Sequence, residues 1–194
     1  MPMLVDYSSR GPDLFAVIYR LAAEGGCEAL TVRKIAAGFG LSAGSLRHQF
    51  PDQHDLLRLT MLKLARDRAR RRAMVSLPSD ALGRLQARCV HALPHETPDN
   101  GSFIEARAWL AFEERARHDD LLGAVSRQVR GEVLTVTEGW LRSAGVAADE
   151  LLVETRRLQG LIEGLTGQQC ASVDPLDVAT ARHALALDLE RYAE

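Results

Sequence analysis

The sequence has few cysteines and no long apolar run, and each shortage argues against a class of protein. The three cysteines, Cys27, Cys89 and Cys170, lie far apart, which indicates neither a disulfide framework nor a Cys-x2-Cys zinc site. No segment approaches the roughly 18 apolar residues of a membrane-spanning helix, and none has the apolar core of a signal peptide. We therefore expect a cytoplasmic protein with reduced thiols.

Aromatic residues are also scarce, at 5% of the 194 residues, whereas helix-forming residues are abundant. Leu, Ala and Arg dominate, and their side chains lose little rotamer freedom in a helix. Turn clusters at intervals of roughly 8–12 residues, which are typical of a β-sandwich or barrel, are missing. The sequence therefore predicts an all-α protein.

The charged residues are distributed unevenly along the chain. Residues 1–75 carry 12 Lys and Arg against 7 Asp and Glu, whereas residues 76–194 carry 12 against 19. The first part is therefore basic and the rest acidic, although the net charge of the chain is only −2. This asymmetry fits a nucleic-acid-binding head on a body that avoids phosphates, and one arginine-rich helix end is the alternative explanation.

The N-terminal part shows clear helix signals. Residues 1–11 lack periodicity, and we expect a mobile arm there. Pro12 and Asp13 suit the first turn of a helix that ends at Gly25 and Gly26.

Capping residues predict where the next three helices begin. Thr31 precedes a helix over 32–39, Ser42 precedes one over 43–49, and Asp52 precedes a long fourth helix. The later helices, which bring the total to about nine, are expected at residues 80–93, 101–118, 120–143, 149–170 and 175–192.

A helix-turn-helix pattern lies within residues 31–57. Two helices that cross at roughly 90–120° need a small side chain where they approach, and Ala36 supplies it. Gly40 tolerates the positive φ of a sharp turn. Leu46 follows six residues later and is expected to point from the second helix into the core.

Residues 14–57 resemble the N-terminal block of the TetR family of transcriptional regulators without a gap. The residues that carry the resemblance are Glu24-Gly25, Leu30-Thr31-Val32-Arg33, Ile35-Ala36, Gly40-Leu41-Ser42, Gly44-Ser45-Leu46, His48, Phe50 and Leu56-Leu57. Two later segments, residues 105–112 and 161–165, resemble the BetI-like branch of the family.

The resemblance implies an N-terminal three-helix helix-turn-helix DNA-binding domain (residues 1–57) and a C-terminal helical domain (residues 58–194) for ligand binding and dimerisation. It implies a homodimeric repressor that binds a palindromic double-stranded DNA operator and is released by an unknown small-molecule effector. The alternative is a helical small-molecule-binding protein whose DNA-binding head no longer functions.

The resemblance and the chemistry of the helix-turn-helix together predict the DNA-contacting residues. They are Thr31, Arg33, Lys34, Ser42, Ala43, Gly44, Ser45, Arg47 and His48. Two positions depart from the family pattern: Arg47 replaces an aromatic residue, usually Tyr, and Gln53 replaces a Lys. Whether Arg47 reads a base or contacts a phosphate stays open.

The long fourth helix ends in an arginine run that includes Arg66, Arg68, Arg70, Arg71 and Arg72. We interpret these side chains as complementing the helix dipole and the acidic second domain. A second DNA site is the alternative interpretation.

Two apparent enzyme motifs are interpreted as accidental. Residues 40–44 match Gly-x-Ser-x-Gly, but a helix is expected where a nucleophile elbow needs a strand, so Ser42 is a better helix cap. His91 and His95 have the spacing of paired zinc ligands, but Pro94 between them disrupts the helix. We expect no enzyme activity, no cofactor and no metal site.

In the second domain, seven residues on the expected helices are candidates for ligand binding, namely Phe103, Arg107, Trp109, Phe112, Trp140, Gln159 and Glu163. The four aromatic ones are more often core residues than pocket residues, because large aromatic side chains dominate helical cores, and the three polar ones suit a pocket or an interface. A tryptophan cage for a quaternary ammonium ligand is conceivable. Apolar stripes on the last two helices predict dimer-interface residues, namely Leu151, Leu158, Ile162, Leu165 and Leu185.

Overall fold

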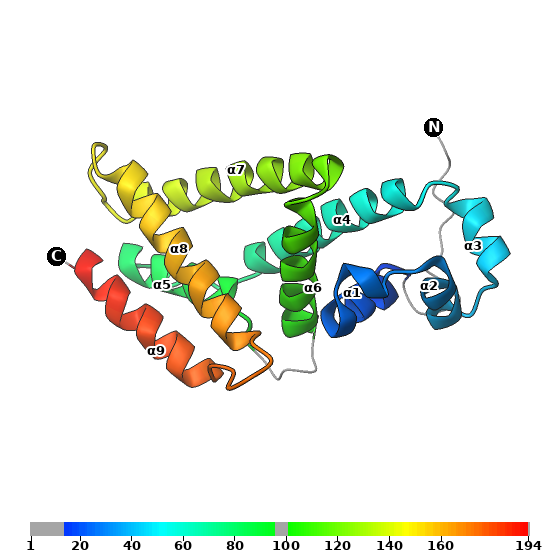
Figure 1. Ribbon diagram of the computed structural model, residues 1–194. Coiled ribbons are helices and arrows are strands. Elements are labelled where there is room, and N and C mark those ends of the chain that lie inside the picture. The colour runs from blue at the N-terminus through cyan, green and yellow to red at the C-terminus, as the bar shows by residue number, and fades with distance from the viewer. Residues whose placement is uncertain (1–13, 96–100, 194) are drawn as a thin grey trace. The chain divides into compact units, whose positions relative to one another are not determined.

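A computed structural model of the chain describes residues 14–95 and 101–193. Its described residues form nine α-helices and two short 3-10 helices, with no strand among them, which confirms the all-α prediction (Figure 1). The helices are α1 (Leu14–Gly25), α2 (Val32–Phe39), α3 (Ala43–Gln49), α4 (Gln53–Ala73), α5 (Ala81–Ala92), α6 (Gly101–Ala116), α7 (Asp120–Ser143), α8 (Leu151–Gln169) and α9 (Val178–Leu189).

The sequence signals locate some helices better than others. Helices α2 and α3 begin and end at the predicted residues. Helix α9 begins at Val178 rather than at residue 175, because the Asp177 side chain accepts the Thr180 backbone N–H at 2.9 Å and caps the helix there. The predicted arm and the first-turn residues Pro12 and Asp13 lie outside the described residues.

The described residues form two compact units. One contains the chain up to Ala65 together with Arg107–Val125, and the other contains Arg66–Ala106 together with the chain from Ser126 onward. Their extents differ from the domains expected from the sequence, because residues 107–125 group with the N-terminal helices. The separate functions expected for residues 1–57 and 58–194 stay predictions.

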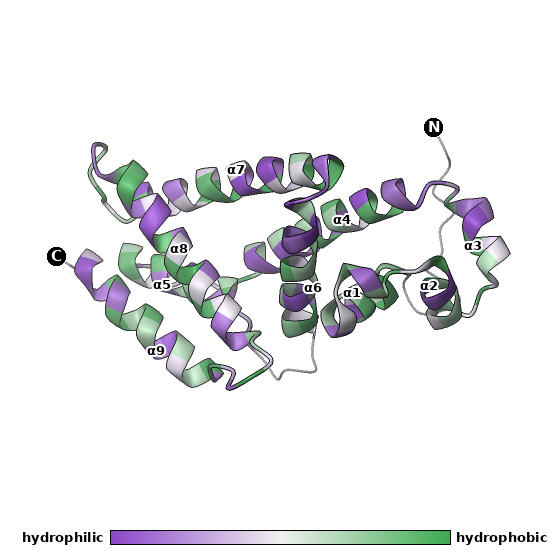
Figure 2. Cartoon of the chain, viewed as in Figure 1, coloured by the Kyte–Doolittle hydropathy of each residue, from purple (hydrophilic) through white to green (hydrophobic). Residues whose placement is uncertain are grey.

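The first unit is organised around apolar residues that recur at helical spacing on α1 to α4. Ile18, Ile35, Leu46 and Met61 are buried, one from each of these helices. Helix α1 packs against α2, and α2 against α3. Figure 2 shows that these helices also carry hydrophilic residues, as is typical of amphipathic helices that cover a small core.

The second unit has its own core, to which α5, α8 and α9 contribute. The five residues predicted to form the dimer interface all belong to this core: Leu151, Leu158, Ile162, Leu165 and Leu185. Because their side chains are buried within a single chain, the dimer-interface prediction for these residues is corrected. A dimer interface on α8 or α9 has to use the exposed residues of these helices.

Candidate nucleic-acid interface

The start of α2 is capped as the sequence predicts. The Thr31 hydroxyl accepts the Lys34 backbone N–H at 3.2 Å, and the Thr31 carbonyl accepts the Ile35 N–H at 2.9 Å. This cap satisfies one of the N–H groups that have no partner within a helix. Thr31, Arg33 and Lys34 are all exposed. The first turn of α2 therefore presents two cations and a helix N-terminus to solvent.

The turn after α2 depends on a glycine. Gly40 has φ 75° and ψ 23°, in the left-handed region that side chains with a Cβ atom rarely adopt. Its N–H donates to the Ala37 carbonyl at 3.2 Å, and the Leu41 N–H donates to the Ala36 carbonyl at 2.8 Å. This pair of hydrogen bonds is a Schellman motif, which ends α2 and redirects the chain toward α3.

Helix α3 is capped by the residue that precedes it, Ser42, and oriented by one of its own residues, Leu46. The Ser42 hydroxyl accepts the Ser45 backbone N–H at 3.0 Å and lies 2.9 Å from the Ser45 hydroxyl. Leu46 is buried, so it holds one face of the helix against the core. At about 100° per residue, Gly44 and His48 lie on the opposite face, with Ser45 and Arg47 on either side of them.

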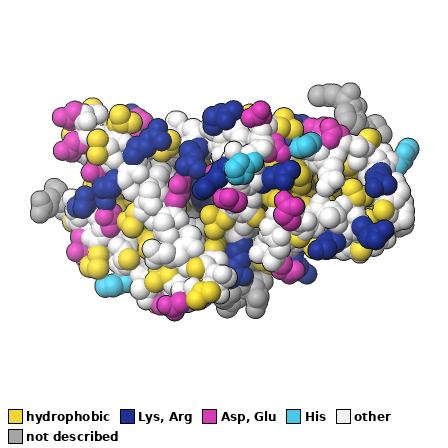
Figure 3. All heavy atoms as spheres, viewed as in Figure 1, with side chains coloured by type: hydrophobic (Ala, Val, Ile, Leu, Met, Phe, Trp, Pro, Cys, Tyr) yellow, Lys and Arg dark blue, Asp and Glu magenta, His cyan; other side chains and the backbone are white. Residues whose placement is uncertain are grey.

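The structure therefore brings most of the predicted DNA-contacting residues to the surface of helices α2 and α3 and of their N-terminal caps. Thr31, Arg33, Lys34, Ser42, Gly44, Ser45, Arg47 and His48 are exposed, and Ala43 is half-buried. Figure 3 shows basic side chains at the surface in the region where α2 and α3 lie. The hydroxyl of Ser42 is already used in the cap, so its structural role is defined.

Gln53 has a structural role that its place in the sequence does not reveal. Its side-chain amide donates to the Leu30 carbonyl at 2.8 Å, across 23 residues of sequence. This bond links the start of α4 to the residue before the α2 cap. The Asp52 carboxylate accepts the His54 backbone N–H at 2.8 Å, which agrees with the predicted cap of the fourth helix.

A second link to α4 involves His54 and Asp119. His54 Nε2 lies 3.0 Å from Asp119 Oδ2, and the side chain of Asp119 is only 6% exposed. Burial acts to raise the pKa of Asp119, but hydrogen bonds from the Leu122 backbone N–H and the His54 ring outweigh it and lower this pKa below its usual value. The Asp119 carboxylate is therefore held in its ionised form.

The apparent enzyme motifs have structural explanations. Ser42 follows helix α2 and a glycine turn, not a strand, so residues 40–44 lack the geometry of a nucleophile elbow. The rings of His91 and His95 stack with centroids 4.5 Å apart. The described part of the chain contains no group of three or more His, Cys, Asp or Glu residues suited to a metal ion.

None of the helices in the described part of the chain is long and apolar enough to span a membrane.

The residues predicted to bind a ligand do not come together in one site. Arg107, Trp109 and Phe112 belong to the first unit, whereas Phe103, Trp140, Gln159 and Glu163 belong to the second. Phe103 and Phe112 are buried among core residues.

The polar candidates of the second unit already have partners within the chain. The Gln159 amide donates to the Thr137 hydroxyl, and Glu163 pairs with Arg130 at 3.6 Å. The Arg88 guanidinium lies 6.0 Å from the ring centre of Trp140, which places a cation of the protein itself beside this aromatic ring.

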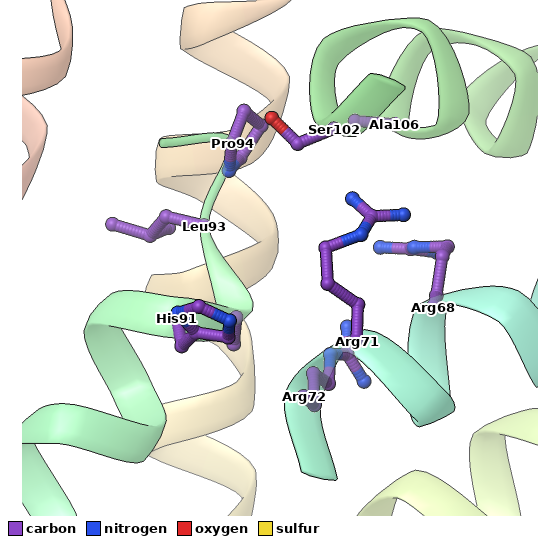
Figure 4. Close-up of a pocket in the computed structure, with 9 residues that line it drawn as sticks. Arg68, Arg71, Arg72, His91, Leu93, Pro94, Ser102 and Ala106 are labelled. Atoms are coloured by element: carbon purple, nitrogen blue, oxygen red, sulfur yellow. The ribbon is translucent and has the colours of Figure 1, made fainter. Parts of the chain in front are cut away.

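The second unit contains a pocket that the sequence analysis missed. Figure 4 shows Arg68 and Arg71 extending from α4 toward Ser102 and Ala106, with His91 nearby. The pocket is lined by Arg68, Arg71, Arg72, His91, Ala92, Leu93, Pro94, Ser102 and Ala106. A helical-wheel signal was present in the sequence, because Arg68, Arg71 and Arg72 share the i, i+3, i+4 spacing of one helix face.

A capped helix, a glycine turn and an exposed second helix define a helix-turn-helix protein of the DNA-binding transcriptional-regulator class. The comparisons with known proteins identify the family. The family model described as "Bacterial regulatory proteins, tetR family" matches residues 14–60. The chain is 30% identical over 184 residues to the HTH-type transcriptional regulator PksA of Bacillus subtilis, which covers 92% of this chain and 86% of PksA. The chain belongs to the TetR family.

Other relatives agree with this assignment. The chain is 27% identical to the regulator BetI of Cronobacter sakazakii over 78% of this chain and 75% of BetI. A transcriptional regulator from Rhodococcus sp. Rha1 has the same fold, with a TM-score of 0.81, 23% identity and coverage of 92% and 93% of the two chains. A regulator from Saccharomonospora viridis, crystallised with choline, superimposes with a TM-score of 0.78 at 21% identity, covering 91% and 93%. Because the relatives include both PksA and BetI, the BetI-like branch stays a prediction.

Proposed function

We propose that this regulator is a homodimeric repressor that binds a palindromic operator and leaves it when a small-molecule effector binds to the second domain. It would act on DNA in the cytoplasm. The observation that carries the proposal is the geometry of α3. Its buried residue Leu46 fixes one face of the helix, so that Gly44, Ser45, Arg47 and His48 are presented to solvent.

The exposed residues of α3 suit the major groove. Gly44 and Ser45 are small, so the helix backbone can approach the bases closely, and His48 lies on the same face as Gly44. Arg47 lies beside this face, where its guanidinium can contact a phosphate or the edge of a guanine. We favour the phosphate, because the family residue at this position usually contacts the DNA backbone.

The start of α2 suits a second backbone contact. Its free N–H groups and the positive end of its helix dipole favour an anion, and the exposed Arg33 and Lys34 add charge. Phosphate contacts from α2 would position the protein on the duplex, whereas α3 would supply the base contacts.

A second copy of the chain is the partner proposed for the exposed face of α8. Leu152, Gly160, Glu163 and Gly164 are exposed and share helical spacing on this face, with Leu152 69% exposed. A Cβ atom built on Gly160 or Gly164 would meet nothing within 4 Å, so a partner helix can approach the backbone closely. A two-fold axis through this face would present two recognition helices to a palindrome.

Release of DNA is proposed to follow a shift between two conformations of the dimer. An effector that binds one conformation better moves the population toward it and changes the spacing of the two recognition helices. Helix α4 is suited to this role, because its first part belongs to the unit with α2 and α3 and its arginine-rich end belongs to the second unit.

A mobility-shift titration with DNA from upstream of the protein's own gene tests the proposal. We expect Arg47→Ala to weaken binding at least tenfold. If Arg47 contacts phosphate, the plot of log K against log salt concentration should become less steep by about 1.8 for the dimer, since each lost phosphate contact contributes about 0.9. Arg127→Ala, which removes an exposed arginine of α7, is the control.

The outcomes separate the possible roles of Arg47. A loss of sequence preference with an unchanged salt slope would mean that Arg47 reads a base. Unchanged affinity and slope would show that Arg47 does not contact the operator. A wild-type protein that binds no upstream DNA would instead favour the alternative, a ligand-binding protein with an inactive head. Gln53, which stands where the family usually has a Lys, does not support this alternative. Its side chain has a structural role within the head, because it donates a hydrogen bond to the Leu30 carbonyl.

A further inference from the structure

The end of α6 is joined to the helix-turn-helix unit by contacts between residues far apart in the sequence. The Cys27 thiol, just after α1, donates to the Ala111 carbonyl of α6 at 3.3 Å. Burial raises the pKa of this thiol to about 11, so the thiol keeps the proton that it donates. One turn further along α6, Arg115 Nη1 lies 3.3 Å from Glu28 Oε1. These contacts connect residues 107–125 to the N-terminal helices with which they form one compact unit.

Asp119, in the turn between α6 and α7, extends these contacts to α4. Its Oδ2 lies 3.0 Å from His54 Nε2, and its Oδ1 accepts the Leu122 backbone N–H of α7 at 3.2 Å. Arg115 Nε lies 3.7 Å from Asp119 Oδ2, which is beyond hydrogen-bonding distance. Among the described residues, the His54 ring therefore supplies the side-chain hydrogen bond that this carboxylate accepts.

His54 is the second residue of α4 and lies close to the end of α3. Only residues 50–52 connect the two helices. Because this connection is short, the position of the first turn of α4 restricts where α3 can lie. Two neighbouring residues hold that turn: Gln53 donates to the Leu30 carbonyl at 2.8 Å, and His54 contacts Asp119.

The local roles of the two residues do not explain why they meet. Asp119 caps α7 through one carboxylate oxygen, and a neutral Ser or Asn could cap it equally well. A negative charge on a DNA-binding head is unfavourable, because DNA phosphates repel it. The His54 side chain is 57% exposed, yet its Nε2 lies against the second carboxylate oxygen. The contact itself accounts for both the charge of Asp119 and the direction of the His54 ring.

We propose that Asp119 is a positioning residue for operator binding, which holds the first turn of α4 through the His54 ring and thereby limits the movement of α3, the proposed recognition helix. This inference rests on the proposed function, because it concerns affinity for the operator. A helix that is already held in its binding position loses less conformational freedom when it binds DNA. Neither Asp119 nor His54 contacts the DNA in this arrangement.

A mobility-shift titration of Asp119→Asn tests the proposal through the sign of the effect. If only the electrostatic field of the head mattered, the loss of a negative charge would tighten DNA binding. We expect the Kd to rise at least fivefold instead, because the single amide oxygen of Asn can face either the Leu122 N–H or the His54 ring but not both. Asp120→Asn removes the same charge from an exposed neighbour in α7 and is the matched control. It should bind the operator as tightly as the wild type or more tightly. Wild-type or tighter binding by Asp119→Asn overturns the proposal.

Variants of His54 separate positioning from a direct phosphate contact. His54→Gln keeps an N–H donor for Asp119 and should stay within twofold of the wild-type Kd, whereas His54→Leu should bind at least fivefold more weakly. Equal losses in the two variants overturn the proposal. At pH 6, where histidine ordinarily carries charge, the salt slope of His54→Leu should equal that of the wild type. A flatter slope would mean that His54 contacts a phosphate.

The double variant His54→Leu/Asp119→Asn tests whether the two residues act through one contact. Each single change already breaks that contact, so the double variant should bind no more weakly than the weaker single variant. Losses that multiply would show that the two residues act independently, which overturns the proposal.

Hydrogen–deuterium exchange of the free protein tests the positioning without DNA. We expect Asp119→Asn, but not Asp120→Asn, to exchange at least threefold faster in peptides that cover residues 43–56, while peptides of α8 exchange as in the wild type. If Asp119→Asn does not fold, His54→Leu should show the same local increase. Unchanged exchange at residues 43–56 overturns the proposal.

The two kinds of measurement distinguish the two hypotheses. A wild-type protein that binds no upstream DNA, but whose variants show the local increase in exchange, contradicts the proposed function alone. Operator binding that neither Asp119→Asn nor His54→Leu weakens contradicts this inference alone.

Discussion

Gly40 and Gly44 lie four residues apart around the helix-turn-helix turn. Only Gly40 has a backbone conformation that disfavours a residue with a side chain. Gly40 has a positive φ, whereas a Cβ atom on Gly44 would meet only the Ser42 hydroxyl oxygen at 3.7 Å. We expect Gly40→Ala to lower the free energy of unfolding by about 1–2 kcal/mol, because an alanine is strained in the left-handed region. Urea denaturation followed by circular dichroism measures this loss.

Gly44→Ala serves as the control for this prediction. Alanine favours a helix over glycine, so the free energy of unfolding should stay constant or rise by up to about 1 kcal/mol. DNA affinity should nevertheless fall, because the added methyl group lies on the face of α3 opposite Leu46. Equal stability losses in the two variants would contradict the role of the Gly40 backbone.

Asp119 predicts a pH dependence of stability. Its pKa is lowered in the folded chain, so its ionised form stabilises the fold above the unfolded pKa of about 3.9, and this contribution is lost as the pH falls through the folded value. We expect Asp119→Asn to cost about 1 kcal/mol at pH 7. The difference from wild type should shrink as the pH falls to 4 and below.

Denaturant midpoints measured from pH 7 down to pH 3.5 check this trend. Asp149→Asn, at an exposed residue between α7 and α8, controls for the general effect of removing a carboxylate. A constant difference between wild type and Asp119→Asn over the whole range would show that the ionised carboxylate is not the stabilising form.

At the scale of elements, the two faces of α8 have different roles. Leu158 is fully buried in the core of the second unit, whereas Leu152 is 69% exposed. We expect Leu158→Ala to lower the free energy of unfolding by about 2–5 kcal/mol, through lost burial and the cavity that it leaves. Leu152→Glu should leave the fold intact but weaken dimerisation, because it replaces an apolar side chain of the interface with a charge that would have to be buried.

Thermal denaturation and analytical ultracentrifugation separate these two effects. The expected result is a lower melting temperature for Leu158→Ala and a larger monomer fraction for Leu152→Glu. If Leu152→Glu remains as dimeric as the wild type at low micromolar concentration, the exposed face of α8 is not the dimer interface.

At the scale of the whole molecule, a symmetric dimer predicts a fixed distance between operator half-sites. Two recognition helices related by a two-fold axis meet the same side of the duplex only when the half-sites lie about one helical turn apart, or a multiple of it. We expect an insertion of about five base pairs between the half-sites to abolish tight binding, because it rotates one half-site by half a turn.

A mobility-shift titration with the lengthened operator measures this effect. The control is the same insertion outside the operator, which should leave the Kd unchanged. Equal affinity for both DNA molecules would show that the two heads do not bind as one rigid unit.

Local signals account for the parts of the structure that were predicted well. The bounds of α2 and α3 follow from the Thr31 and Ser42 caps and from the turn at Gly40, and all three act within a few residues of sequence. The caps and apolar periodicity likewise predict the approximate positions of the other helices. The family resemblance, which the relatives confirm, depends on the same short block.

Contacts between residues far apart in the sequence could not be predicted in this way. The apolar stripe with Leu158 and Leu185 suits a core or a dimer interface equally well, and only packing within one chain assigns it to the core. The hydrogen bond from Gln53 to Leu30 depends on how α4 meets the start of α2.

The sequence by itself therefore determined the helices, the DNA-binding head and the family, because caps, turns and periodic patterns are local. Only the tertiary structure decided which faces of these helices are buried and which groups meet. The arginines of α4 show the difference: their spacing separates Arg68, Arg71 and Arg72 from Arg66 and Arg70, but only the packing of α5 and α6 around the first three forms a pocket. Side chains distant in sequence produce such a site, and their positions depend on the packing of the whole unit.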